Sequence, residues 1–151
     1  MKLAEALLER ANLQKDAAQI EARIKNNALV QEGDEPAEDP KALLPLYEQK
    51  LEALQKIIQR INHTNAVTPF GDGEMIADAI ARKDILARNL NGYRALYQAL
   101  QISQNRFGQM EIRFVRTMDP ADVQKRIDEL SKQYRELDTK LQGLNWQVDL
   151  I

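Results

Sequence analysis

The strongest constraint on the fold is an unbroken run of apolar residues near the C-terminus, spaced alternately four and three positions apart. Its members are Val123, Ile127, Leu130, Tyr134, Leu137, Leu141 and Leu144, followed by Val148 and Ile151. This spacing places all of these side chains on one stripe of an α-helix. A stripe sustained over several turns is typical of a coiled-coil seam, which must pack on another helix. The residues from Val123 to Leu144 are therefore predicted to form a helix-packing seam.

The same stretch carries its own start and stop signals. Asp119 suits the N-cap, and Pro120 suits the first helical position. Gly143 has low helix propensity, so we expect the regular helix to end there while the apolar tail packs on. The sequence therefore predicts a helix over residues 119–142.

Similar apolar seams run through residues 3–24, 44–61 and 76–100, and they predict helices over 2–28, 40–64 and 73–104. Arg10 and Lys83 are the charged residues within these seams. Each could fix the register or the oligomeric state of helix pairing, or extend its charge to the solvent, and the sequence leaves both readings open. The helix over 73–104 has a second apolar edge at Ile85, Leu96 and Ala99, so we expect it to be covered on two sides.

These patterns predict an all-α protein of long amphipathic helices, arranged as a bundle or as coiled-coil hairpins in a single domain over 1–151. Aromatic residues make up only 5% of the chain, which also favours helices over a sheet. Ile112 and Phe114 alternate with Glu111 and Arg113, so one short β element is predicted near 110–117. Its partner would be residues 66–70 or the same segment of a second subunit.

Composition excludes several classes of protein. The chain has no cysteine, which rules out disulfides, thiolate zinc sites and a cysteine nucleophile. It has no apolar run long enough for a membrane-spanning helix, and Glu5 lies where a signal peptide would need apolar residues. We therefore expect a cytoplasmic protein with no membrane partner.

Charge is distributed unevenly along the chain. Residues 1–81 carry nine basic and fourteen acidic residues, residues 82–118 seven and two, and residues 119–151 five and seven. A basic middle between acidic ends suits a self-complementary homo-oligomer. Arg106, Arg113 and Arg116 lie among phenylalanines and form the candidate anion or nucleic-acid contact. The sequence pI of about 5.5 argues against nucleic acid as the partner.

The most acidic stretch, "VQEGDEPAEDP", covers residues 30–40. A helix-loop-helix calcium site needs alternate acids, a central glycine and a closing glutamate. Here Gly33 falls between Glu32 and Asp34, and Pro36 breaks the loop, so the pattern does not fit. We interpret it as a solvated linker in which Asp39 starts the next helix. Two alternatives stay open: weak binding of a divalent ion by Glu32, Asp34 and Glu35, and docking of this stretch onto the basic middle of a partner chain.

No motif indicates catalysis. His63 is the one histidine, so the paired Glu-x-x-His motifs of a di-iron bundle cannot form. Neither a Gly-rich phosphate loop after a strand nor a Gly-x-Ser-x-Gly elbow occurs. We therefore expect no catalytic, metal-binding or cofactor-binding residues, no cofactor, and a protein that is not an enzyme.

Several stretches together resemble the septicolysin-like family of small bacterial proteins. They are "KLAEALLERANLQK", "NNALVQEGDEPAEDP", "RINHTN", "IARKDIL", "EIRFVRT" and "IDELSKQYRELDTKLQGLNWQVDL". The resemblance covers essentially the whole chain and implies a helical, largely uncharacterised protein with no catalytic residues to transfer. The family name suggests a pore-forming cytolysin.

The function expected from the sequence is that of a non-enzymatic, self-associating helical protein that acts through protein–protein interaction. The second hypothesis is a weak binder of nucleic acid or of an anionic surface through the basic segment 82–116. The third is the pore-forming cytolysin that the resemblance implies. The sequence does not identify the process, the partner or the size of the oligomer.

Overall fold

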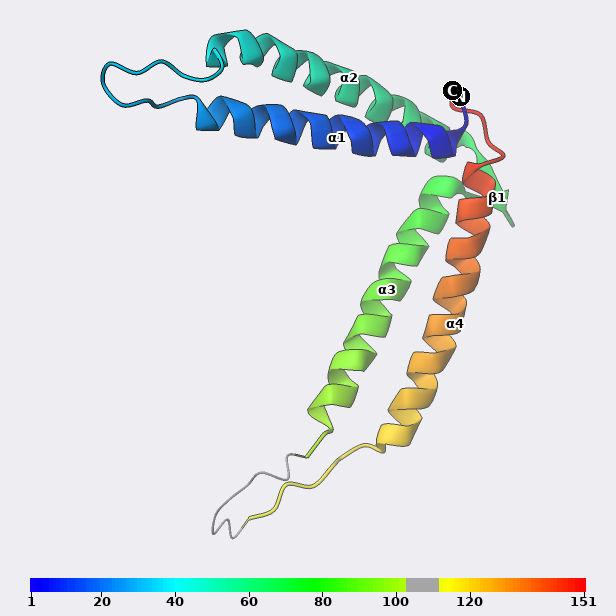
Figure 1. Cartoon of the computed structure of the whole chain (residues 1–151). Coiled ribbons are helices and arrows are strands. Elements are labelled where there is room, and N and C mark those ends of the chain that lie inside the picture. The colour runs from blue at the N-terminus through cyan, green and yellow to red at the C-terminus, as the bar shows by residue number, and fades with distance from the viewer. Residues whose placement is uncertain (103–111) are drawn as a thin grey trace. The chain divides into compact units, whose positions relative to one another are not determined.

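A computed structural model describes residues 1–102 and 112–151, and these residues form four long helices and one small sheet (Figure 1). The helices are α1 (Leu3–Asn26), α2 (Pro40–Val67), α3 (Ile76–Ala99) and α4 (Pro120–Asn145). The strands are β1 (Pro69–Gly71) and β2 (Glu74–Met75). The predicted all-α class is confirmed, and the arrangement is one of helical hairpins.

The chain divides into two compact units. The first comprises Met1–Ala77 and Gln142–Ile151, and the second comprises Asp78–Leu141. Each unit contains one helical hairpin, α1–α2 in the first and most of α3–α4 in the second. The single domain over 1–151 stays a prediction, since it concerns whether the two units unfold together.

In the first unit, α1 and α2 run side by side in opposite directions (Figure 1). The small residues Ala4, Ala6 and Ala17 of α1 are buried, and α1 packs on α2. Leu43, Ile57 and Ile61 of α2 are also buried. An ion pair between Lys50 Nζ and Asp16 Oδ2, at 2.7 Å, links the two helices.

A β-hairpin connects α2 to α3. β1 and β2 pair antiparallel across the two residues Asp72 and Gly73, whose φ angles are 53° and 79°. Positive φ at both positions defines a type I′ turn, for which Asp-Gly is a preferred sequence. The helix predicted over 73–104 therefore begins later, at Ile76, because this hairpin precedes it. The short β element thus lies at 69–75, while residues 112–117 contain no strand and 110–111 lie outside the described residues.

Substitution of the two glycines Gly73 and Gly92 should have opposite effects on stability. Gly73→Ala forces a Cβ into the left-handed region and should destabilise by about 1 kcal/mol. Gly92→Ala, in the interior of α3 with no atom within 4 Å of the new Cβ, should stabilise by about 0.5–1 kcal/mol. Urea unfolding followed by circular dichroism measures both changes. Equal effects in the same direction would contradict the assigned turn.

The last residues of the chain return to the N-terminus within the first unit. Leu3 N donates to Val148 O and Leu150 N donates to Met1 O, each at 2.9 Å. Leu150 is buried, as we expect for an apolar tail that packs on. The prediction that the helix stops at Gly143 is wrong, because α4 continues to Asn145. One glycine near a helix end costs only about 1 kcal/mol, which neighbouring contacts offset.

In the second unit, α3 and α4 pack through one apolar layer. Its buried members are Leu90, Leu100, Val123, Ile127 and Leu130, with Leu86, Tyr93, Leu96 and Tyr97 partly buried against them. The prediction that α3 is covered on two sides is wrong for the described residues, because Ile85 is 66% exposed and Ala99 is also exposed. A two-helix hairpin covers only one face of each helix.

Candidate interaction site

The site lies where the α3–α4 hairpin turns back, and its first part is the end of α3. The last carbonyl groups of a helix have no intrahelical partners. Here Arg116 Nε donates a hydrogen bond to the carbonyl oxygen of Leu100 at 2.6 Å, just after α3 ends at Ala99. This contact ties the chain before α4 to the end of α3.

The second part is the start of α4. Asp119 Oδ1 accepts a hydrogen bond from Ala121 N at 2.9 Å, and Pro120 is the first helical residue. The predicted start of this helix is therefore confirmed. Asp122 adds a negative charge in the first turn, where the helix dipole favours it.

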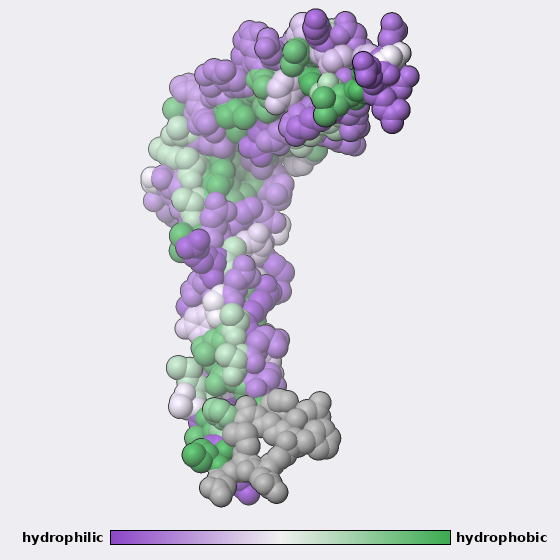
Figure 2. Space-filling view, turned by 90° about the vertical axis from the view of Figure 1, so that its left-hand side faces the viewer, coloured by the Kyte–Doolittle hydropathy of each residue, from purple (hydrophilic) through white to green (hydrophobic). Residues whose placement is uncertain are grey.

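Between these two helix ends lies an exposed segment, residues 112–118, which we call the apolar segment. Ile112 is 80% exposed, Val115 79%, Phe114 64% and Met118 53%. Figure 2 shows green hydrophobic residues gathered on this hairpin next to the grey atoms, among purple hydrophilic residues. Soluble monomers rarely expose several large apolar side chains together, and such surfaces often mark interaction sites.

A groove of about 630 Å³ adjoins the apolar segment, between the end of α3 and the start of α4. Its apolar lining comes from Tyr93, Leu96, Met118 and Val123. Asp119, Asp122, Arg126 and Thr117 complete it. We call this hollow the α4 groove. It combines an apolar lining with two carboxylates.

The three arginines of the candidate anion site have different surroundings. Arg106 lies outside the described residues. Arg113 is exposed, and Arg116 is exposed but its Nε is bound to the Leu100 carbonyl. Among these residues, the structure therefore describes Arg113 at the surface and Arg116 in contact with the end of α3.

The predicted seam faces inward along α4. Val123, Ile127, Leu130, Leu137 and Leu141 are buried, whereas Tyr134 and Leu144 are half-buried. Lys83 of α3 meets this seam, because its Nζ lies 2.9 Å from Asp138 Oδ1 and 6.0 Å from the centre of the Tyr134 ring. Of the two readings left open for Lys83, these contacts favour fixing the register. The other seam charge, Arg10, has a buried Nε without a hydrogen-bond partner among the described residues.

The Lys83–Asp138 pair should show measurable coupling. The hydrogen bond to Asp138 raises the pKa of Lys83, while burial acts in the opposite direction. A double-mutant cycle with Lys83→Met and Asp138→Asn should give a coupling energy of about 0.5–1 kcal/mol at neutral pH. Because the folded-state pKa of Lys83 is raised, this stabilisation should disappear as the pH rises through that value. Coupling that is absent at neutral pH would contradict the role in register.

The acidic stretch over residues 30–40 is tied to the end of α1, where Glu38 N donates to Asn27 Oδ1 at 3.0 Å. Glu38 pairs with Arg23 of α1 through several hydrogen bonds, including Nε–Oε2 at 3.0 Å. This contact lowers the pKa of Glu38. Asp39 Oδ1 accepts from Lys41 N at 3.0 Å, which confirms that Asp39 starts α2. Glu32, Asp34 and Glu35 are exposed.

Neutralising the exposed acids should hardly change stability. The triple variant Glu32→Gln, Asp34→Asn, Glu35→Gln should melt like the parent, because exposed charges usually change stability by less than about 0.5 kcal/mol. The measurement is thermal unfolding of both proteins with and without calcium. A calcium-dependent rise in melting temperature that the variant lacks would show that these residues form an ion site.

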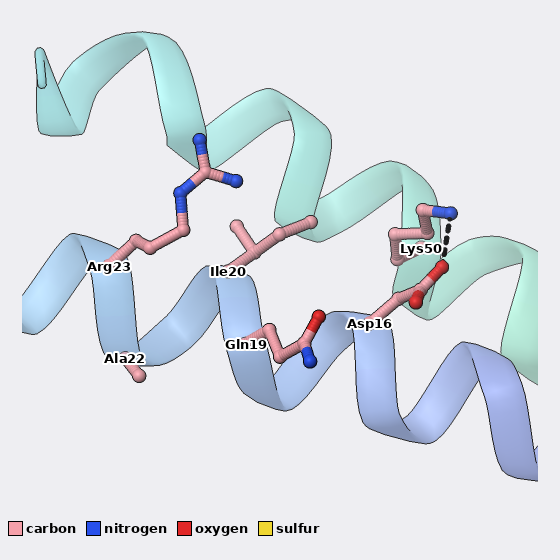
Figure 3. A pocket seen from close by; sticks show the side chains of 6 residues that line it. All are labelled: Asp16, Gln19, Ile20, Ala22, Arg23 and Lys50. Carbon is pink, nitrogen blue, oxygen red and sulfur yellow. Dashed lines mark hydrogen bonds and ion pairs between the residues drawn. The ribbon is translucent and has the colours of Figure 1, made fainter.

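A second groove, of about 520 Å³, lies on the α1–α2 hairpin (Figure 3). Asp16, Gln19, Ile20, Ala22, Arg23 and Lys50 line it. Its two cations already have carboxylate partners, since Lys50 pairs with Asp16 and Arg23 with Glu38. This groove therefore presents little uncompensated positive charge to an anion.

Other features of the described residues add no site. His63 is exposed in α2. Within residues 1–102 and 112–151, no group of three carboxylate or imidazole side chains could hold a metal ion. None of the helices in this part of the chain has the length and apolarity needed to cross a membrane.

Comparisons with known proteins identify relatives of unknown function. The sequence model described as "Family of unknown function (DUF6847)" matches residues 10–150. The crystal structure of a functionally unknown conserved protein from Corynebacterium diphtheriae is 38% identical and has a TM-score of 0.93. The match covers 100% of this chain and 99% of that one. No curated protein matches the chain.

Proposed function

The chain belongs to the family of unknown function DUF6847, and we propose from its own residues that it is a cytoplasmic, non-enzymatic helical protein that acts by self-association. The observation that carries this proposal is the exposure of Ile112 and Val115 next to an apolar groove. Removing such side chains from water is the main driving force of protein association.

Light scattering over a range of protein concentrations tests the proposal. We expect the mass of the full chain to rise from that of a monomer toward that of a dimer as the concentration passes through the micromolar range. A monomer mass at every concentration up to about 1 mM would overturn it, since a Kd of 1 mM corresponds to only about 4 kcal/mol.

The basic segment 82–116 supports a second candidate function, binding to nucleic acid or another anionic surface. Arg113 is exposed within the apolar segment, as such a contact requires. Retention on single-stranded DNA or on anionic vesicles should then fall steeply with added salt. Release of dye from the same vesicles would instead favour the pore-forming hypothesis. Self-association predicts neither retention nor release.

A further inference from the structure

We propose that two copies of the chain dock reciprocally, with the apolar segment of each copy seated in the α4 groove of the other. This inference rests on the proposed self-association and specifies its contact. The segment supplies Ile112 and Val115 as apolar anchors and Arg113 as a charge. The groove supplies an apolar lining, the carboxylates of Asp119 and Asp122, and the guanidinium of Arg126, which already pairs with Glu129.

The apolar parts of the two surfaces match. Ile112 and Val115 are about four-fifths exposed, at 80% and 79%. They therefore do not fill the α4 groove of their own chain, although Thr117 and Met118 of the same segment line it. The groove volume of about 630 Å³ is large enough for several apolar side chains. Burying such side chains is worth roughly 1.5–3 kcal/mol each.

The charges of the two surfaces are complementary. Arg113 and Arg116 are both exposed cations of the segment, and Arg116 Nε is already bound to the Leu100 carbonyl. Asp122 lines the groove in the first turn of α4. Asp119 already caps α4, which leaves Asp122 as the better partner for an incoming guanidinium. A planar guanidinium can bind a carboxylate through two parallel hydrogen bonds, which adds orientation to affinity.

The position of the two surfaces favours a second copy of the chain as the occupant of the α4 groove. Segment and groove adjoin each other at the same end of one hairpin. A two-fold axis beside that end brings each segment to the other copy's groove, so both contacts form twice and the assembly closes as a dimer. A different partner would have to supply a basic, apolar segment that the chain already carries.

Charge reversal tests the docking in the full chain. Arg113→Glu places like charges together in both contacts of a homodimer, and so does Asp122→Lys. Either variant alone should weaken dimerisation about 100-fold, because like charges brought together at an interface cost several kcal/mol. An equimolar mixture of the two variants should dimerise within about threefold of the parent, since both contacts then pair opposite charges.

Matched controls carry the same charge changes elsewhere in the second unit. Arg94→Glu on α3 and Asp128→Lys on α4 replace exposed residues that do not line the groove. Both should dimerise like the parent, and circular dichroism should show all four variants folded. Sedimentation velocity gives the dimer fraction for each protein and for the mixture.

The outcomes separate the two proposals. A parent that dimerises while neither reversal weakens it overturns the docking and leaves self-association standing. Dimerisation could instead stay weak in the mixture while the double variant Arg113→Glu, Asp122→Lys dimerises like the parent. The two charges would then meet within one chain, and this result would also overturn the docking. A parent that stays monomeric overturns both proposals.

Discussion

Replacing Leu130 with alanine should lower the free energy of unfolding by roughly 2–5 kcal/mol, the range for truncating a well-packed core leucine. Leu130 is only 1% exposed and belongs to the apolar layer that joins α3 to α4. This layer is one side chain thick, so the cavity left by the substitution opens between the two helices. A domain has only about 5–15 kcal/mol of stability, so the effect should be large.

The control for this prediction is Gln133→Ala, one turn further along α4 on an exposed position. Alanine has the highest helix propensity, so this change should leave stability within about 0.5 kcal/mol of the parent or raise it slightly. Urea unfolding followed by circular dichroism measures both variants. Similar small losses from Leu130→Ala and Gln133→Ala would show that α3 and α4 do not pack through this seam.

The double variant Ile112→Ser, Val115→Ser should dissociate the proposed dimer without unfolding the chain. Each side chain is worth roughly 1.5–3 kcal/mol when buried, and a symmetric dimer buries each of them twice. The lower end of this range, about 6 kcal/mol for four side chains, exceeds the roughly 4 kcal/mol of a 1,000-fold change, so we expect dimerisation to weaken at least about 1,000-fold. Because both residues are about four-fifths exposed in the single chain, at 80% and 79%, its melting temperature should hardly change at low concentration.

Light scattering and a thermal melt of the same samples separate dissociation from unfolding. The matched control is Ile85→Ser. It removes another exposed apolar side chain, 66% exposed, which lies on α3 and outside the apolar segment. It should dimerise like the parent. If Ile85→Ser dissociates the dimer and the double variant does not, the contact lies on the uncovered face of α3 instead.

Much of the fold follows from local rules. The start of α4 depends on Asp119 and Pro120, and its seam depends on a spacing that places the buried residues on one face. Both can be predicted without knowing what the helix packs on. The hairpin at Asp72-Gly73 could also have been found, because Asp-Gly is a strong turn signal. It was missed because the flanking strands are very short.

The candidate site could not be predicted in the same way. The spacing of Ile112 and Phe114 suggests alternating faces, but it does not say whether either face is covered. In the sequence, Arg116 is one of the three cations of the candidate anion site. Its contact with the Leu100 carbonyl depends on where α3 ends. Tyr93 of α3 and Asp122 of α4 both line the α4 groove, although they are far apart in the sequence. Such proximity depends on tertiary packing that no local pattern encodes.

Amide hydrogen exchange of the full chain at low and high protein concentration tests the location of the contact most directly. We expect peptides covering residues 93–97 and 112–126 to become more protected as the concentration rises through the dimerisation range. Peptides from α1 and α2 should exchange equally at both concentrations. Protection that rises only in α1 and α2, or that does not depend on concentration at residues 112–126, would contradict self-association through this end of the α3–α4 hairpin.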